Sequence, residues 1–471
     1  MMMIKTATNF FKRQIENKTR SRLPFCLMLA GFMVLVALRN TVALDYPVII
    51  LTVYAGAMAV FSDRDEMVAF GIACIPFSPA FYYDTVLTML ILIYIVKYPK
   101  TLKGFKLWAL IPFALMMGWE LWHEILYGFS GMNYFYAFMT IGFTAFVVCA
   151  ADWKLDFGLI SRVLAVSTVF CCAMTLLRML IAKDFDAVLL FSDRWYRLGI
   201  DAKHIGESIS YVLRYNPNGL GEICNLSIIG LLLRMKQKGF NIVDGLLAVS
   251  LVLFGALTQS RMFLLTFAVV VFIYALTVQN GVVNRLRNIG VLVCIGAVGV
   301  GIVWLVSPFV IEHILARLGE ADISNGRNDL FAWYNEYLIS DPEHLWFGTG
   351  LQEIVKKVNA DVVFPTFSVP HNGIQELVIV WGIPGLLMFL GFIACMVIAA
   401  KKSCKKLCFV GFIPLIMLFV NGMFGQIITS GTVKVTLCFV FAALATDFSN
   451  KTKIKDENEK IKLRHEKLMN K

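Results

Sequence analysis

The chain is dominated by a succession of long apolar runs that carry no charge and are separated by short polar or turn-rich segments. Hydrophobic residues make up 58% of its 471 residues and charged residues only 16%, whereas ordinary globular chains are about 45–50% apolar and about 25% charged. One soluble core could not bury so much apolar surface. Since a membrane helix needs about 20 apolar residues, about fourteen of them would occupy roughly 280 residues, a share close to the apolar fraction. The composition therefore predicts a polytopic membrane protein.

In lipid the backbone hydrogen bonds must close within the chain, so we interpret the apolar runs as helices. The expected fold is an all-α transmembrane helix bundle of about fourteen spans. Pro76 and Pro79 interrupt the third run, and the fourth is short. The spans are expected at residues 23–38, 46–61, 67–83, 85–96, 107–126, 135–152, 158–182, 218–235, 244–259, 262–278, 288–308, 372–400, 407–425 and 428–446.

The formal net charge of +11 comes from short basic runs between the apolar segments. Because these cations are not clustered on a soluble unit, we do not expect nucleic acid as a partner. Such runs are typical of cytoplasmic loops, and alternation from a cytoplasmic N-terminus places every one of them there. The sequence thus predicts that both termini lie on the cytoplasmic side. The runs are Lys12 to Arg22, Lys97 to Lys106, Arg234 to Lys238, Arg285 and Arg287, Lys401 to Lys406, and Lys451 to Lys471.

The same alternation leaves two long loops outside, and loops of this length usually carry a function. In the second, apolar residues recur at i, i+3, i+4, i+7 and i+8, which predicts an amphipathic helix against the membrane surface or the bundle: Leu330, Trp333, Tyr334, Tyr337 and Leu338. The expected organisation is a cytoplasmic N-terminus (1–22), N-terminal transmembrane helices (23–182), an external loop (183–217), central transmembrane helices (218–310), a large external loop (311–370), C-terminal transmembrane helices (371–446) and a basic cytoplasmic tail (447–471).

Four polar motifs lie at the outer ends of the predicted spans. They are Arg197-Leu-Gly followed by Arg214-Tyr-Asn-Pro-Asn218-Gly; Thr258-Gln-Ser-Arg261; Gly326-Arg327, with Gly348-Thr-Gly350 after its helix; and Pro370-His371-Asn-Gly, followed by Trp381-Gly-Ile-Pro384-Gly.

Three residues of these motifs are candidates for chemistry. Arg261 stands between two apolar segments, where a charge is costly unless it faces a cavity or an anion; the alternative is that it snorkels to lipid headgroups. Arg327 opens a helix, where the macrodipole disfavours a cation; the alternative is a solvated loop charge. His371 is a candidate base because imidazole titrates near neutral pH; the alternative is a helix cap or an interfacial residue.

Converging arginines would clamp a phosphate or pyrophosphate through charge-assisted hydrogen bonds. A neighbouring neutral histidine would then accept a proton from a hydroxyl nucleophile. None of these four motifs contains a DxD triplet or a His/Cys/Asp cluster, so we expect neither a metal nor another cofactor.

The order of these motifs resembles the O-antigen ligase and O-antigen (capsular polysaccharide) polymerase superfamily, over roughly residues 190–390. Its members are bacterial multi-pass enzymes of the GT-C type, which use an undecaprenyl-diphosphate-linked glycan as donor and need no metal. The resemblance implies that Arg261 and Arg327 bind the diphosphate and that His371 is the base. It also implies substrate-binding roles for Arg197, Arg214 and Asn218, which match the earlier motif.

Further charged residues lie within the predicted spans. Lys434 is a candidate substrate-binding residue, because an ionisable group inside a span is functional by default; the alternative is that it snorkels. Glu376, a further candidate for substrate binding, and Glu222 sit about one turn inside their spans and could pair with the arginines. We interpret Trp119, Glu120 and His123 as part of an interfacial belt.

The leading hypothesis is an inverting glycosyltransferase that polymerises undecaprenyl-diphosphate-linked oligosaccharide units at the outer face of the membrane. One alternative is a ligase that transfers the glycan to a lipid A core or another acceptor. Another is a polysaccharide flippase, which would carry charges through mid-membrane and interrupted helices in matching halves; here the unusual charges gather at one face. Expected partners are the lipid-linked oligosaccharide and membrane lipids, with a chain-length regulator protein as a further candidate.

Overall fold

The computed structural model describes most of the predicted spans but few residues of the first external loop. The residues 1–21 and 449–471, predicted as cytoplasmic, lie outside the described residues, and so do residues 352–369 of the second external loop. The described ranges are 22–41, 46–127, 131–150, 155–182, 197–199, 216–278, 281–306, 308–318, 327–340, 342–351, 370–404, 407–428 and 431–448.

All regular structure in these ranges is helical, which confirms the predicted all-α class. The helices are α2 (Leu23–Thr41), α3 (Val48–Phe61), α4 (Arg64–Ala73), α5 (Tyr83–Lys97), α6 (Ile111–Tyr127), α7 (Gly131–Ala150), α8 (Phe157–Ala182), α10 (Pro217–Lys238), α11 (Ile242–Leu257), α12 (Arg261–Thr277), α13 (Val282–Val306), α14 (Pro308–Leu318), α15 (Arg327–Ser340), α16 (Pro342–Phe347), α18 (Gly373–Ser403), α19 (Ile413–Phe424) and α20 (Val433–Leu444), with the short 3-10 helices η1 (Ile75–Ala80), η2 (Pro99–Gly104), η3 (Leu107–Leu110) and η5 (Phe409–Phe412).

Two of these helices are long and apolar enough to cross a membrane, Phe157–Ile181 and Gly373–Ser403. A third qualifies if Gly299–Leu305 and Pro308–Ala316, which meet at an angle of 112°, form one broken span. The part of the chain that the structure describes therefore does not support the predicted count of about fourteen spans. Many of the other apolar helices are too short: α12 has 17 residues, or about 25 Å at 1.5 Å per residue, against a hydrocarbon core of about 30 Å.

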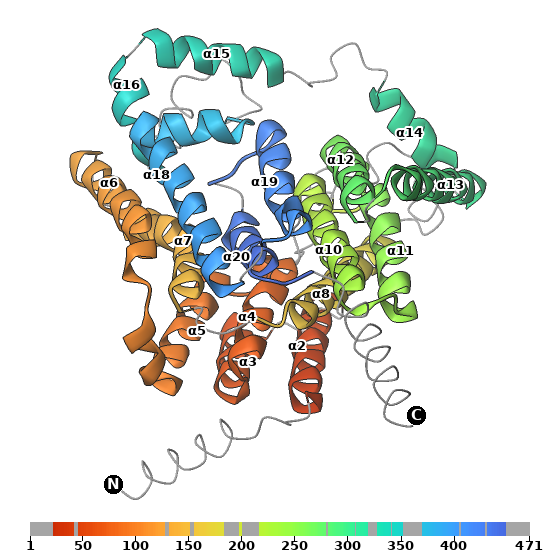
Figure 1. Ribbon diagram of the computed structural model, residues 1–471, viewed down its shortest axis with the longest axis horizontal. Helices are drawn as coiled ribbons and strands as arrows, with labels where there is room; N and C mark the ends of the chain where they lie inside the picture. Colours follow the sequence, from red (N-terminus) through yellow and green to blue (C-terminus); the bar gives the residue numbers. More distant parts are fainter. Residues whose placement is uncertain are drawn as a thin grey trace, which may run out of the picture.

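α20 illustrates why an apolar run can end as a buried helix rather than a lipid-facing span. Every one of its 12 residues is buried, Lys434 included, as expected for a helix that is apolar on nearly every side. It packs against α7 from the first half of the chain and against α18 and α19 from the second. Figure 1 shows it in the middle of the bundle. The N- and C-terminal parts of the chain thus share one core.

The predicted span at 67–83 is broken in the structure. Asp63 and Glu66 form a capping box that starts α4, and α4 ends at Ala73. The following segment, which contains Pro76 and Pro79, is the 3-10 helix η1. Proline lacks an amide donor and clashes with the preceding helical turn, so the single span that we expected divides into two short elements.

The predicted helix of the large external loop is confirmed as α15. Leu330, Tyr334 and Leu338 are buried, so one face of α15 packs against the bundle, as expected from their spacing. On α18, the side-chain amide of Gln375 donates to the Phe331 carbonyl and to the Asn335 side chain, both at 2.9 Å. Figure 1 shows α15 and α16 at the top, at the opposite end of the molecule from α2 and α3.

The segment after α16 fits against a break in α18. Gly382 has φ 68°, and a Cβ there would lie 2.3 Å from the Trp346 carbonyl oxygen. Only glycine accepts both this left-handed conformation and this close approach at no steric cost. The amide of Thr349 donates to the Ile379 carbonyl at 2.8 Å. The break in α18 therefore holds the external segment.

The interpretation of Trp119, Glu120 and His123 as an interfacial belt is wrong for the last two. Glu120 is 0% exposed and His123 2% exposed. Glu120 accepts hydrogen bonds from the Trp381 indole at 2.6 Å and from the Leu351 amide at 3.2 Å. These two side chains anchor the external segment to α6 instead of facing lipid headgroups.

Candidate functional site

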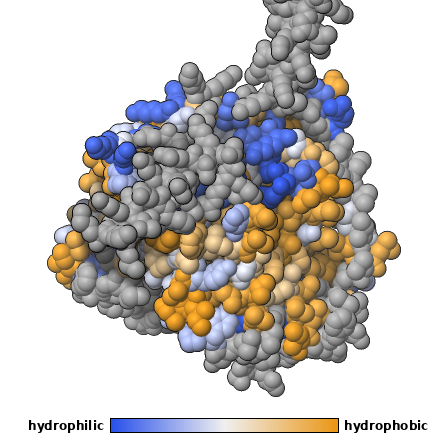
Figure 2. All heavy atoms as spheres, turned by 90° about the horizontal axis from the view of Figure 1, so that it is seen from below, coloured by the Kyte–Doolittle hydropathy of each residue, from blue (hydrophilic) through white to orange (hydrophobic). Residues whose placement is uncertain are grey.

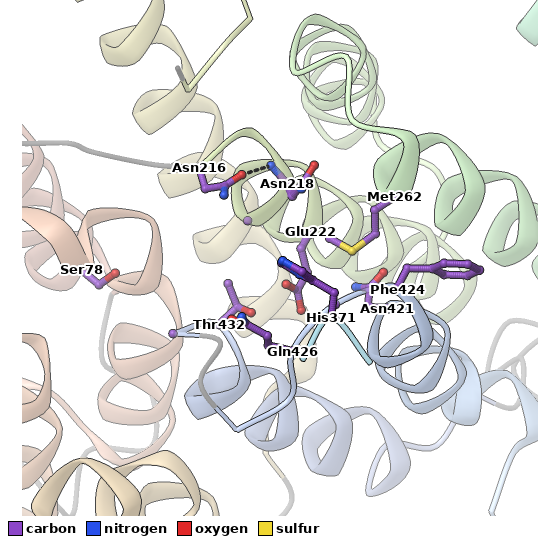
Figure 3. Close-up of a pocket in the computed structure, with 13 residues that line it drawn as sticks. Ser78, Asn216, Asn218, Glu222, Met262, His371, Asn421, Phe424, Gln426 and Thr432 are labelled. Carbon is purple, nitrogen blue, oxygen red and sulfur yellow. Dashed lines mark hydrogen bonds between the residues drawn. The ribbon is translucent and has the colours of Figure 1, made fainter. Parts of the chain in front are cut away.

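Polar side chains from distant parts of the sequence meet around a cavity of about 260 Å³. It lies where α10, α18 and α19 begin or end, with the connection between α19 and α20 forming one wall (Figure 3). Its lining residues are Ser78, Asn216, Asn218, Gly219, Glu222, Met262, His371, Asn421, Phe424, Gly425, Gln426, Gly431 and Thr432.

The Asn216-Pro-Asn218-Gly motif builds the first wall. The Asn216 side chain caps α10 by accepting from the Asn218 amide at 2.9 Å, and Pro217 occupies the first helical turn, where a missing amide costs nothing. The side chain of Asn218 in turn accepts a hydrogen bond from the Ser260 hydroxyl at 2.8 Å. The structure thus places Asn218 in the cavity, at the junction of α10 and α12.

The Arg197 motif lies against the turn that leads to Arg261. Arg197 Nε donates to the Thr258 carbonyl at 2.9 Å, and the Leu198 amide donates to the Leu257 carbonyl at 2.9 Å. Gln259 in this turn has φ 49°, a conformation uncommon for residues other than glycine. Two motifs separated by about sixty residues in the sequence are therefore joined in the structure.

The other three predicted arginines have different outcomes. Arg261 begins α12 and is half-buried; its neighbour Met262 lines the cavity, but Arg261 itself is not among the lining residues described. Arg327 begins α15, and its side chain lies outside the described residues, as does the whole of Arg214. The arginine clamp stays a prediction.

His371 lines the cavity and stands two residues before Gly373, the first residue of α18. The next residue, Asn372, caps this helix by accepting from the amides of Ile374 and Gln375, both at 3.1 Å. His371 is half-buried, and Figure 3 shows its ring pointing into the same space as Glu222 of α10. An imidazole and a carboxylate from segments about 150 residues apart thus face one cavity.

Glu222 is fixed by polar neighbours on α19 and beside α20. Its carboxylate is hydrogen-bonded to the Thr432 side chain and lies near the Asn421 side chain, whose oxygen accepts from the Thr266 hydroxyl at 2.6 Å. Glu222 is 8% exposed. A buried carboxylate needs such partners, and these ones hold it at the cavity wall.

Glu376, predicted to bind substrate, lies behind the cavity wall. Its carboxylate accepts hydrogen bonds from the backbone amides of Ile427 at 2.5 Å and Ile428 at 2.9 Å, and it is 0% exposed. These bonds fix the connection between α19 and α20, which carries Gln426 and Thr432 into the cavity. The structure shows Glu376 holding this connection, and its role in substrate binding stays a prediction.

Lys434 lines a second cavity, of about 390 Å³. Its ammonium lies 2.5 Å from the carboxylate of Asp84, and it is 4% exposed, so it pairs within the protein instead of snorkelling. Ser78 and Gly431 line both cavities. Lys434 therefore borders the space next to the one that holds His371.

Several lining residues were not identified from the sequence, namely Ser78, Asn421, Gln426 and Thr432. Asp84, the partner of Lys434, was also missed. Each is a polar side chain within or beside an apolar run, and that pattern is the signal that could have found them.

Buried charge is not confined to the end of the molecule that carries His371. At the end from which α8 and α11 start, Arg162 and Arg234 both pair with Asp244, which is 0% exposed. The expectation that unusual charges gather at one face is therefore wrong. Within the described residues, no three His, Cys, Asp or Glu side chains converge as a metal site would require.

Neither the known family models nor the curated proteins give a match to this chain.

Proposed function

We propose that the chain is a membrane glycosyltransferase that polymerises lipid-diphosphate-linked oligosaccharide units at the outer face of the cytoplasmic membrane. The observation that carries the proposal is the cavity in which His371 and Glu222 are surrounded by amide and hydroxyl side chains. The resemblance of the motifs to the O-antigen polymerase superfamily supplies the donor, an undecaprenyl-diphosphate-linked glycan.

The chemical character of the lining suits a sugar. Asn216, Asn218, Asn421 and Gln426 carry amides that both donate and accept hydrogen bonds, and Ser78 and Thr432 add hydroxyls. Sugar hydroxyls need this dual capacity. Met262 and Phe424 offer apolar surface, against which the carbon face of a sugar ring can pack.

The size of the cavity limits what enters it. Its volume of about 260 Å³ is just below the range of about 300–1,000 Å³ for sites that enclose drug-sized ligands. It suits one reacting sugar residue, with the lipid tail and the remaining glycan outside. This arrangement is consistent with a donor that stays anchored in the membrane.

In the proposed reaction, the acceptor hydroxyl oxygen attacks the anomeric carbon of the donor sugar, and His371 accepts the hydroxyl proton. The bond between the anomeric carbon and the diphosphate oxygen breaks, and the lipid diphosphate leaves with the electron pair. Arg261 and Arg327, which begin α12 and α15, would stabilise the charge that grows on this leaving group. Attack opposite the leaving group inverts the anomeric centre.

Polymerase and ligase differ only in the acceptor, which is another lipid-linked unit or a lipid A core. We favour the polymerase because the sequence contains no recognisable site for a lipid A core. The same purified protein, given both acceptors in competition, distinguishes the two: elongated lipid-linked product supports the polymerase, and glycosylated lipid A core supports the ligase.

A flippase is the second candidate, and two observations favour it. α18 is interrupted at Gly382, and buried charges lie at both ends of the bundle. Interrupted helices bind substrates in many transporters. Against this, the break in α18 is filled by the segment around Gly348, because a Cβ on Gly348 would lie 2.5 Å from the Val380 carbonyl oxygen.

The test uses the full chain in lipid nanodiscs with an undecaprenyl-diphosphate-linked oligosaccharide and no added metal. The wild-type protein should form a ladder of elongated glycans, and His371→Ala should form none. His313→Ala, on α14 outside the cavity, is the matched control and should retain the ladder. Transbilayer movement of the donor without new glycosidic bonds would support the flippase and overturn the glycosyltransferase.

A further inference from the structure

A groove at the opposite end of the molecule from His371 combines apolar walls with a cationic mouth. Its volume is about 460 Å³, and it lies between the start of α2 and the first turns of α8. Leu29, Met33, Val163 and Val166 line it, together with Cys26 and Ala30. α8 is one of the helices that are long and apolar enough to cross a membrane, so the groove opens beside a candidate span.

Four cations stand among the lining residues of the groove: Arg22, Arg162, Arg234 and Lys238. Two carboxylates behind them serve as shared partners. Asp244 pairs with Arg162, at 2.8 Å, and with Arg234. Asp156 pairs with Arg22 at 2.8 Å and with Lys238 at 3.4 Å.

This arrangement leaves the mouth with an excess of positive charge. Four cations less two carboxylates gives +2. A third carboxylate, that of Asp65, accepts from the Asp156 amide at 3.4 Å, and counting it lowers the excess to +1. With either count the mouth keeps a net positive charge, which favours an anionic ligand over a neutral one.

Three of the four cations share a carboxylate partner and remain partly exposed, so a ligand can reach them. The side chains of Arg22, Arg162 and Lys238 are 40%, 37% and 47% exposed. Arg234, at 10%, is held inside by its own pairs. Figure 2 shows the molecule from below, where hydrophilic surface gathers in patches directly beside extensive hydrophobic surface. A ligand for such a boundary needs both an anionic head and an apolar tail.

We propose that this groove binds one anionic glycerophospholipid from the leaflet at this end of the molecule. The headgroup phosphate lies at the mouth, between Arg22, Arg162 and Lys238, and one acyl chain lies along the apolar wall. Guanidinium groups suit phosphate because they offer several donors in a plane. Basic pockets between membrane helices are typical binding sites for anionic headgroups. The proposal does not depend on the function proposed for the cavity at His371.

The site is tested by native mass spectrometry of the full chain in detergent, titrated with phosphatidylglycerol or with the neutral phosphatidylcholine. Phosphatidylglycerol should bind the wild-type protein more tightly. The double variant Arg22→Gln/Lys238→Gln should weaken that binding about 25-fold, at about fivefold for each cation near the membrane surface. Binding of phosphatidylcholine should change little.

Two further variants separate this groove from general surface charge. Lys100→Gln/Lys103→Gln removes the same charge from two exposed lysines of η2 and should leave phosphatidylglycerol binding unchanged. Ala30→Phe fills the groove without changing charge and should lower binding.

Three outcomes would overturn the proposal: equal affinity for the two lipids, an equal loss in the η2 variant, or displacement of the lipid by inorganic phosphate at equal concentration. The last would mean that the acyl chain contributes nothing.

Discussion

The hydroxyl of Ser260 donates a hydrogen bond of 2.8 Å to the side chain of Asn218, and this bond joins the starts of two helices at the wall of the cavity. The same oxygen accepts from the Phe263 amide at 3.3 Å, so Ser260 is also the N-cap of α12. One side chain therefore orients a cavity residue and begins the helix that carries Arg261.

Replacing Ser260 with alanine should remove both bonds at once. We expect the loss of the cap to lower the free energy of unfolding by about 1 kcal/mol and glycan elongation to fall because Asn218 loses its orientation. Thermal unfolding and the elongation assay measure the two effects. Ser403→Ala, which removes a hydroxyl bonded to the Ala399 carbonyl at the far end of α18, should lower neither strongly. Full activity in Ser260→Ala would show that this bond does not position the site.

The stability and activity of Glu376 variants should follow the capacity of the new side chain to accept hydrogen bonds. Glu376→Ala leaves the buried amides of Ile427 and Ile428 without their acceptor, at a cost of about 1–3 kcal/mol for each unsatisfied group. Glu376→Gln keeps one acceptor oxygen and should recover part of both stability and activity. The measurement is kcat for elongation beside thermal stability. A role in direct substrate binding would instead raise KM in Glu376→Gln while leaving stability unchanged.

The ion pair between Lys434 and Asp84 should be coupled in a double-mutant cycle. Lys434→Met alone or Asp84→Leu alone leaves one charge without its partner, and each should lower the free energy of unfolding by about 1–3 kcal/mol. The double variant should lose less unfolding free energy than the two single variants lose together, because replacing a buried ion pair by apolar groups is often close to neutral. Additive losses would mean that the two side chains stabilise the protein independently.

Asp156 should make stability depend on pH in the acid range. Burial raises the pKa of its carboxyl. Lys238, the Leu159 amide and Arg22 together lower this pKa by more than burial raises it, so the pKa lies below the ordinary value of 3.8. A lowered folded-state pKa stabilises the protein above pH 3.8, and this contribution is lost as the pH falls through the folded-state value.

The control for this effect is Asp156→Asn, which cannot titrate. The wild-type protein should be the more stable at about pH 6, by less than about 1 kcal/mol because the pair is partly exposed. The difference should disappear in strong acid. Equal stability of the two proteins at both pH values would contradict the ion pairs at Asp156.

The sequence was sufficient for the helical class and for the motif residues that begin helices. Asn218 and His371 were identifiable because each stands in a polar motif at the start of an apolar run, and α15 because Leu330, Tyr334 and Leu338 recur at helical spacing. Such signals depend only on neighbouring residues in the sequence, so they can be recognised without knowing the tertiary contacts.

Partners across long sequence separations could not be predicted in this way. No local pattern predicts that Glu376 accepts a hydrogen bond from the Ile427 amide, or that the Trp381 indole donates one to Glu120. Hydropathy alone also does not separate a span from a buried helix, and α20 has the composition of a span but lies in the core. The described residues therefore do not support the span count that hydropathy predicts.

The measurement that tests the proposed function most directly is glycan elongation by purified protein carrying His371→Ala, with His313→Ala as control. We expect the donor lipid to remain bound and no new glycosidic bond to form with His371→Ala, while the control elongates as the wild-type protein does. Undiminished elongation by the His371→Ala protein would contradict the role of this cavity in the reaction.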